Sequence, residues 1–225
     1  HAKDRRQRQM CIRDSSKGEE QYLKRVLEVF EEDPSEIVKT SDLANRLEVS
    51  PASVTEMLKK LAARDLVTHI PYRGSRLTSQ GFILANKVKR RQLLIEILLT
   101  DVAGMTSNAR KLAANFEHHL DQESEYELDR ALGFPSETLD GRKISDIERR
   151  KSDIHNANNA NDMAIGTEGI VYSMKLSGSS LGVLSTIGIQ IGSTVKRTET
   201  GIKIDGIEYS LDINTMCSIM VLQGD

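Results

Sequence analysis

One short segment carries the small polar side chains that protein helices use to bind duplex DNA. Ser50 is a good helix N-cap and Pro51 suits the first helical position, so we expect a helix over about residues 51–64. Its first turns would offer hydroxyl groups, small apolar contacts for thymine methyl groups and free amides for phosphate, from Ser50, Pro51, Ala52, Ser53 and Thr55. A helix with such an outer face suits the major groove of DNA.

A local excess of positive charge covers the same region. Between Arg46 and Arg91, ten Lys or Arg residues stand against three acidic residues, a net charge of +7, although the whole chain has a net charge of −2. We expect Lys59, Arg73 and Arg76 to contact the DNA backbone, with an affinity that falls as salt rises. A charged run alone is more often a solvated surface, so its position on a DNA-binding motif is what gives it meaning.

The elements expected to position these side chains form a winged helix-turn-helix over about residues 19–78. Apolar residues recur at three- and four-residue spacing from Glu19 to Asp33, and a second helix begins near Thr40. Two short extended runs within residues 66–78 flank a cationic turn and predict a hairpin, the wing. A winged helix used only for protein contacts is the alternative.

The remainder of the chain predicts an α+β protein with two further parts. Residues 79–133 carry three amphipathic helical patterns. Residues 134–162 are rich in Asp, Asn, Ser and Arg, which predicts a flexible linker. Residues 163–225 alternate β-like runs with glycine turns, which favours a five-stranded SH3-like β-barrel.

Composition excludes several other classes of protein. Cys11 and Cys217 lie far apart, so neither a disulfide framework nor a zinc ribbon is expected, and Cys217 fits a small buried hydrophobe. The sequence has no phosphate loop and no complete catalytic motif, so an enzyme is not expected. It also lacks a membrane-length apolar run and a signal-like stretch, which favours the cytoplasm. Residues 1–16 are expected to be a disordered or non-native tail.

The order of these parts resembles the diphtheria-toxin-repressor family of metal-dependent transcriptional regulators, over about residues 19–225. The strings that carry the resemblance are EEQYLKRVLEV, LANRLEVSPASVTEMLKKLAARDLV, YRGSRLTSQG, RRQLLIEILLTDVAG and FEHHL. The C-terminal part is similar to the ferrous-iron-transport A-like (FeoA-like) domain. The resemblance implies a homodimeric repressor of palindromic operator DNA, with Mn²⁺ or Fe²⁺ as corepressor and a metal-binding and dimerisation domain at residues 79–133.

The resemblance also implies a metal site, which this sequence keeps only in part. Glu117 and His118 stand where the family's Glu-His ligand pair occurs, and Glu96 matches a further family glutamate. Gln21 occupies the position of a helix-one Met or Asp ligand. Other family ligand positions are changed, and the residues found there are Lys24, Gln92, Ala114 and either Arg110 or Lys111.

Two hypotheses about metal follow from these changes. Cations at Lys24 and at Arg110 or Lys111 could neutralise carboxylates that otherwise need a divalent ion, which would give a metal-independent regulator. Alternatively, a relaxed oxygen and nitrogen site for Mn²⁺ or Fe²⁺ could be built from Glu117, His118, His119, Glu96 and Gln21. From a different class, the chain could be an adaptor that binds a protein through its SH3-like domain.

Overall fold

The computed structural model describes residues 15–70, 73–150, 157–175, 183–184 and 186–223. Contacts divide the chain into two compact units, residues 1–90 and 91–225, and each unit is described by itself. Most of the tail expected at the N-terminus, residues 1–14, lies outside the described residues. Within the described part of the chain, no helix is both long and apolar enough to cross a membrane.

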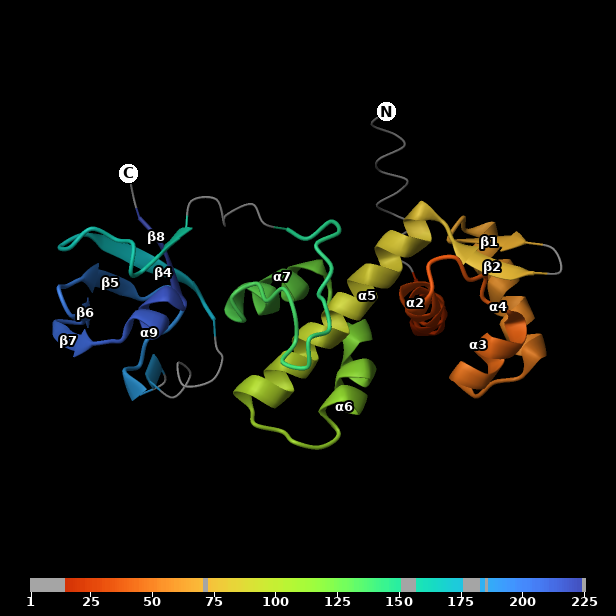
Figure 1. The fold of residues 1–225 in the computed structure, drawn as a ribbon, viewed down its shortest axis with the longest axis horizontal. Helices are drawn as coiled ribbons and strands as arrows, with labels where there is room; N and C mark the ends of the chain where they lie inside the picture. Colours follow the sequence, from red (N-terminus) through yellow and green to blue (C-terminus); the bar gives the residue numbers. More distant parts are fainter. Residues whose placement is uncertain (1–14, 71–72, 151–156, 176–182, 185, 224–225) are drawn as a thin grey trace, which may run out of the picture. The chain divides into compact units, whose positions relative to one another are not determined.

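The first unit is a winged helix-turn-helix, as predicted (Figure 1). Its elements are α2 (Lys17–Glu32), α3 (Thr40–Leu47), α4 (Pro51–Ala63), β1 (Val67–Ile70), β2 (Gly74–Leu77) and the first part of α5 (Ser79–Ile97). α2 begins two residues earlier than the apolar pattern suggests because Ser16 and Glu19 form a capping box, in which each side chain accepts from the other's backbone amide.

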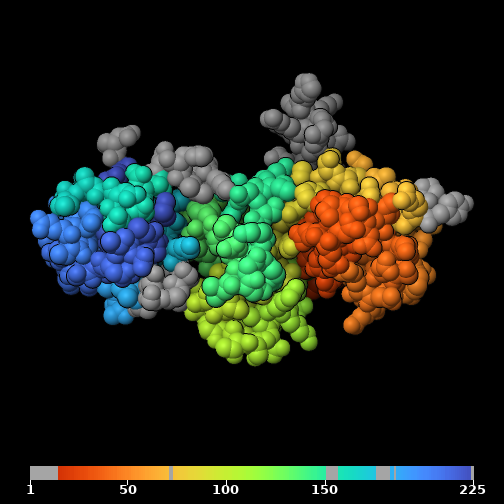
Figure 2. All heavy atoms as spheres, viewed as in Figure 1, coloured from red at the N-terminus to blue at the C-terminus, as the bar shows by residue number. Residues whose placement is uncertain are grey.

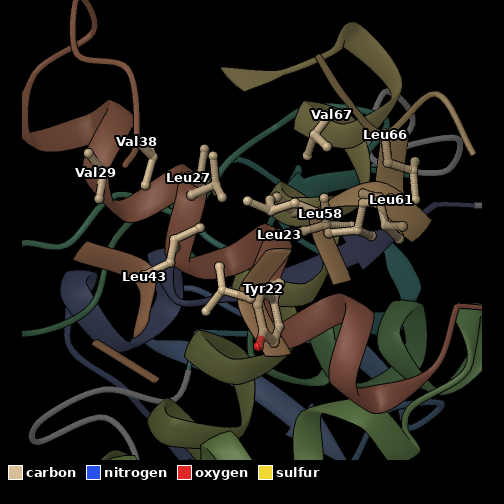
Figure 3. Close-up of a cluster of buried hydrophobic side chains, with 14 of the residues drawn as sticks. Tyr22, Leu23, Leu27, Val29, Val38, Leu43, Leu58, Leu61, Leu66 and Val67 are labelled. Atoms are coloured by element: carbon tan, nitrogen blue, oxygen red, sulfur yellow. The ribbon is translucent and has the colours of Figure 1, made fainter. Parts of the chain in front are cut away.

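The core of the first unit lies where its three short helices meet, as Figure 3 shows. Leu23 of α2, Leu43 of α3 and Leu61 of α4 are completely buried there. These residues recur at the three- and four-residue spacing that places them on the inner face of each helix. Burial of one such leucine side chain contributes about 1.5–3 kcal/mol to the free energy of folding. The core therefore holds α4 in position through its buried face.

The helices of the second unit are α5 from residue 91 onward, a π-helix η1 (Leu98–Val102), α6 (Ala109–Phe116), a 3₁₀ turn η2 (Glu117–His119) and α7 (Gln122–Ala131). The sequence pattern suggests one continuous helix over residues 106–121, whereas the α-helix ends at Phe116. Glu117 and His118 therefore lie on a 3₁₀ turn. Such a turn is wound more tightly than an α-helix, so their side chains point in other directions than an α-helix would give them.

Residues 134–150 differ from the flexible linker that their composition favours. Arg149 forms a buried ion pair with Asp129 of α7, with 2.5 Å between a guanidinium nitrogen and a carboxylate oxygen. Ile144 is 5% exposed and packs with apolar residues of α5 and α7. The polar residues of this segment thus have specific partners in the second unit, which composition alone does not reveal.

The C-terminal part of the second unit is an antiparallel sheet with strand order β3-β8-β4-β5-β6-β7. Its strands are β3 (Ala157–Asn159), β4 (Glu168–Met174), β5 (Thr194–Arg197), β6 (Gly201–Ile204), β7 (Ile207–Ser210) and β8 (Ile219–Leu222), with α9 (Ile213–Cys217) between the last two. The α+β fold class is confirmed. The sheet has six strands, whereas the sequence predicts five. The additional strand, β3, lies within residues 134–162, which their composition assigns to a linker. Cys217 is exposed rather than buried.

Aromatic side chains join the helices of the second unit to its sheet. The hydroxyl groups of Tyr126 on α7 and Tyr172 on β4 are hydrogen-bonded at 2.6 Å, and both residues are buried. The Phe134 ring lies 6.2 Å from each tyrosine ring, centroid to centroid. Gly133, with a φ of +75°, approaches the backbone of Lys175 so closely that a Cβ atom would lie 2.9 Å from its Cα.

Candidate nucleic-acid interface and metal residues

The N-terminus of α4 presents the hydroxyl groups that the sequence predicts. Ser50 caps the helix by accepting a hydrogen bond from the Ser53 amide at 3.1 Å, and the Thr55 hydroxyl donates to the Pro51 carbonyl at 2.9 Å. Residues 50–53 and Thr55 are all exposed. Pro51 has no amide hydrogen, and the Ser53 and Val54 amides donate to Ser50, so the Ala52 amide and a surface of small side chains remain to meet phosphate and base edges.

The face of α4 that carries these residues is held outward by its buried side. Val54 and Leu61 are completely buried and Leu58 is 4% exposed, while Lys59 is exposed on the other side. The preceding turn is tight because Glu48 adopts a left-handed conformation, with φ of 56°, at the end of α3. Figure 2 shows the orange surface of this region open to solvent on the first unit.

The wing places two further cations on the surface of the first unit. β1 pairs with β2 from Val67↔Leu77 to Ile70↔Gly74. Arg73 and Arg76 are exposed, and a terminal guanidinium nitrogen of Arg76 donates to the Ser35 carbonyl at 2.6 Å. The hairpin tip at residues 71–72 lies outside the described residues.

A buried carboxylate joins the C-terminal half of α4 to the start of α2. Glu19 is 1% exposed and accepts from the Arg64 guanidinium at 2.6 Å, with the Lys60 ammonium 3.5 Å from its other oxygen. Burial acts to raise its pKa, but the Ser16 amide and the two cations outweigh this, so the pKa of Glu19 lies below its usual value. Sequence reasoning missed this contact because the residues lie 45 positions apart.

Glu117 and His118 form a buried pair in the second unit. Glu117 is 0% exposed, and one of its carboxylate oxygens lies 3.2 Å from Nε2 of His118. Two donors bound to one divalent ion at about 2.1 Å each lie about 3 Å apart, so this separation suits two ligands of a shared ion. The oxygen and nitrogen donor types suit Mn²⁺ or Fe²⁺. These two residues therefore fit part of a metal site.

Glu96 has a protein cation as its partner. The Arg142 guanidinium donates to both carboxylate oxygens of Glu96, at 2.6 and 3.1 Å, and also to Asp140 at 2.8 Å. Hydrogen bonds to Glu96 raise the pKa of Arg142 above its usual value, so the guanidinium stays charged. The sequence prediction named Arg110 or Lys111 for this role, but both are exposed, and sequence reasoning missed Arg142 because it treated residues 134–162 as a linker.

The other residues that the metal hypotheses name include Gln21, Lys24 and His119. Gln21, half-buried, and Lys24, 5% exposed, belong to α2 of the first unit. His119 is exposed. Among the described residues, no group of three or more His, Cys, Asp or Glu side chains is arranged to hold a metal ion.

Two family models match the chain over most of the helical region. The iron-dependent repressor N-terminal DNA-binding domain matches residues 15–75, and the iron-dependent repressor metal-binding and dimerisation domain matches residues 78–146. Together these segments cover more than half of the 225 residues. The chain belongs to the iron-dependent repressor family.

Several curated members of this family are similar to the chain. The transcriptional regulator MntR of Escherichia coli O6:H1 is 39% identical over 83 residues, which are 37% of this chain and 54% of that protein. MntR of Shouchella clausii is 33% identical over 101 residues, 45% of this chain and 69% of that protein. An uncharacterized helix-turn-helix regulator of Methanocaldococcus jannaschii is 34% identical over 109 residues, 48% of this chain and 86% of that protein. The chain spans about half the length of its Escherichia coli relative.

Solved structures share the fold of this family member. A structure of ScaR with bound Zn²⁺ has a TM-score of 0.51 at 24% identity and covers 91% of this chain and 99% of its own. IdeR of T. acidophilum has a TM-score of 0.51 at 21% identity and covers 94% of this chain and 100% of its own. At these identities the likeness establishes the fold, including the C-terminal sheet.

Proposed function

We propose that this family member is a homodimeric transcriptional repressor that binds palindromic operator DNA in the cytoplasm and responds to Mn²⁺ or Fe²⁺. The observation that carries the proposal is the exposed N-terminus of α4, with its small polar side chains, beside a wing that bears Arg73 and Arg76. A helix of this kind enters the major groove while the wing contacts the backbone. The matched DNA-binding and dimerisation models support the same function.

The proposed division of roles follows from the chemistry of each side chain. Ser53 and Thr55 would contact base edges through their hydroxyl groups, and Ala52 would contact thymine methyl groups. The Ala52 amide, which follows Pro51 in the first turn, would bind a phosphate. Lys59, Arg73 and Arg76 would bind phosphates through their positive charges, so we expect the affinity to fall steeply with salt.

Glu117 and His118 are the residues that we propose to hold the metal ion. A divalent ion at this position would supply the positive charge that balances the buried carboxylate of Glu117. Burial keeps both side chains in place, because neither can turn into solvent without leaving the packed turn η2. In this proposal the chain binds DNA and metal and carries out no catalysis.

A metal-independent regulator is the second candidate, and one observation favours it. Arg142 already neutralises Glu96 with two hydrogen bonds, as a cation built into the protein would do. In that case the helices of the second unit would keep the same arrangement without metal. The two candidates differ in the effect of a chelator on DNA binding.

The deciding experiment selects palindromic DNA from a random library and measures binding with EDTA and with Mn²⁺ or Fe²⁺. We expect specific binding that needs the metal and is lost in Glu117→Gln. Equal binding in EDTA would instead support the metal-independent candidate, and Arg142→Gln should then weaken DNA binding.

The DNA contacts are tested separately with charge-reversal variants. We expect Lys59→Glu combined with Arg73→Glu to abolish binding to duplex DNA, because two phosphate contacts become repulsive. Lys203→Glu, an exposed change on β6, is the matched control and should leave DNA binding unchanged. If both proteins bind DNA equally, α4 and the wing do not form the interface.

A further inference from the structure

The first unit contains an apolar pocket beside the wing. The pocket has a volume of about 430 Å³ and lies between the C-terminal half of α2, the wing strand β2 and the first turn of α5. This volume falls within the usual range of small-molecule sites, about 300–1,000 Å³. All of its lining residues belong to residues 26–83, so the pocket is a property of the DNA-binding unit alone.

The interior of the pocket is hydrocarbon in character. Val26 forms part of the buried core, and Leu77 and Ile83 add partly buried aliphatic side chains. The rings of Phe30 and Phe82 meet edge to face, with 5.4 Å between their centroids. Phe30 remains 39% exposed at the pocket. An apolar ligand would cover this surface.

The rim of the pocket carries the guanidinium of Arg76, which forms no ion pair with the described residues. Arg76 is exposed, and among the described residues its one recorded polar partner is the Ser35 carbonyl, a neutral acceptor. The N-terminus of α5 also lines the pocket through Thr78 and Ser79, and a helix N-terminus favours an anion. Glu36 is the one acidic residue of the lining and is itself exposed to solvent.

We propose that this pocket binds a free amphiphilic carboxylate, such as a medium-chain fatty acid. Its carboxylate pairs with the Arg76 guanidinium, and its chain packs against the rings of Phe30 and Phe82 and against the aliphatic lining. Charge complementarity selects a carboxylate over an amine of the same chain length, and the volume limits the length of the chain.

Occupancy of the pocket is coupled to DNA binding, a step that rests on the proposed function. Arg76 is one of the cations assigned to the DNA backbone, so a bound carboxylate competes with phosphate for the same guanidinium. Val38, which lines the pocket, is also hydrogen-bonded to β2. Val38 and Ser75 exchange two backbone hydrogen bonds, at 3.1 and 2.9 Å. The amphiphile and DNA therefore weaken each other's binding by the same factor.

The test is calorimetric titration of the full chain without DNA, using octanoate, decanoate and dodecanoate below their micelle concentrations. We expect one site per chain and an affinity that rises about fourfold for each added methylene, until the pocket is full. Dodecylammonium, with the same chain and the opposite charge, should bind at least tenfold more weakly. Equal binding of the two dodecyl compounds, or no saturable binding, would overturn the proposal.

Two variants separate the head group from the chain. Arg76→Gln should weaken dodecanoate binding at least tenfold and abolish the preference over dodecylammonium. Ile83→Phe fills the pocket, so it should also weaken dodecanoate binding, while DNA binding without the amphiphile stays unchanged. Thermal unfolding checks that both variants are folded. Unchanged dodecanoate affinity in both variants would place the ligand elsewhere and contradict the proposal.

A competition experiment tests the coupling. Dodecanoate should raise the apparent Kd of the wild-type chain for its selected operator and should have little effect on Ile83→Phe. Dodecanoate binding without any effect on DNA affinity would overturn the coupling and leave the pocket standing. Failure to bind any DNA would contradict the proposed function. The calorimetric titrations, which contain no DNA, would still show whether the pocket binds the carboxylate.

Discussion

The carboxylate of Glu19 connects two helices of the DNA-binding unit, the start of α2 and the end of α4. Its Oε2 atom accepts both from the Ser16 amide at the start of α2 and from the Arg64 guanidinium beyond the end of α4. A buried carboxylate is stabilising when its partners are charged and well placed, and its protonation would leave those partners uncompensated. The ionised Glu19 thus adds to the apolar core in holding α4, and hence its proposed DNA-binding face, in position.

We expect the first unit to lose stability in acid partly through Glu19. Its pKa is lower in the folded than in the unfolded chain, so its stabilising effect is complete above the unfolded pKa of about 4.3 and is lost as pH falls through the folded pKa. Glu19→Gln should therefore be less stable than wild type at neutral pH, and its stability should change less on acidification. Urea unfolding at about pH 7 and pH 3.5 measures both effects.

Glu56→Gln is the matched control for this prediction, because Glu56 is an exposed carboxylate on the outer face of α4. It should keep the pH dependence of the wild type. If Glu19→Gln also kept the pH dependence of the wild type, the inference that the pKa of Glu19 is lowered in the folded chain would be contradicted.

At the scale of elements, α4 combines a structural and a proposed functional role in one residue. Ser50 caps the helix through the Ser53 amide, and the same end of the helix is proposed to meet DNA. The two roles respond differently to substitution, because a cap needs an acceptor whereas a phosphate site excludes negative charge.

Two variants at Ser50 should separate these roles. Ser50→Ala removes the cap and should destabilise the chain by about 1 kcal/mol. Ser50→Asp restores an acceptor and should be about as stable as wild type, yet it places a negative charge where phosphate is expected. We therefore predict that Ser50→Asp loses more DNA affinity than Ser50→Ala, as measured by thermal unfolding and DNA titration. The opposite order of affinities would argue against a phosphate at this helix end.

The elements differ in how far the sequence alone predicts them. Helices such as α2 and α4 were predictable, because local spacing and caps at Ser50 and Pro51 define them. The ordered segment 134–150 was not, because Arg142 meets Glu96 across 46 residues and composition carries no information about such partners. The DNA residues could be proposed for the same local reason, whereas the cation beside Glu96 depended on tertiary contacts.

At the scale of the whole molecule, the contact between α7 and β4 joins two differently built parts of the second unit. Gly133 is needed there twice, for its φ of +75° and for its approach to Lys175. Gly104 has a similar φ of +69° but has nothing within 4 Å of the position that a Cβ would occupy. The two glycines thus form a natural comparison between backbone strain alone and strain combined with a lost contact.

We expect Gly133→Ala to release the sheet from α7, whereas Gly104→Ala should show strain alone. The strain costs about 1–3 kcal/mol in either variant. Only Gly133→Ala should also raise amide hydrogen exchange near Tyr126 and Tyr172, because their hydrogen bond depends on the close approach. Similar exchange in both variants would mean that the contact at Gly133 does not hold the sheet.

The short distance along the chain between Arg150 and β3 limits how far the sheet can travel. Arg150 is ion-paired to Glu123 of α7, and β3 begins at Ala157. Seven residue steps therefore separate Arg150, which is held by α7, from Ala157, which is held by the sheet. Whatever conformation they adopt, they span at most about 25 Å. A tether of this length keeps the detached sheet at millimolar effective concentration near α7. A weak contact at Tyr172 therefore suffices to keep the two parts together, and any signal that opens it is readily reversed.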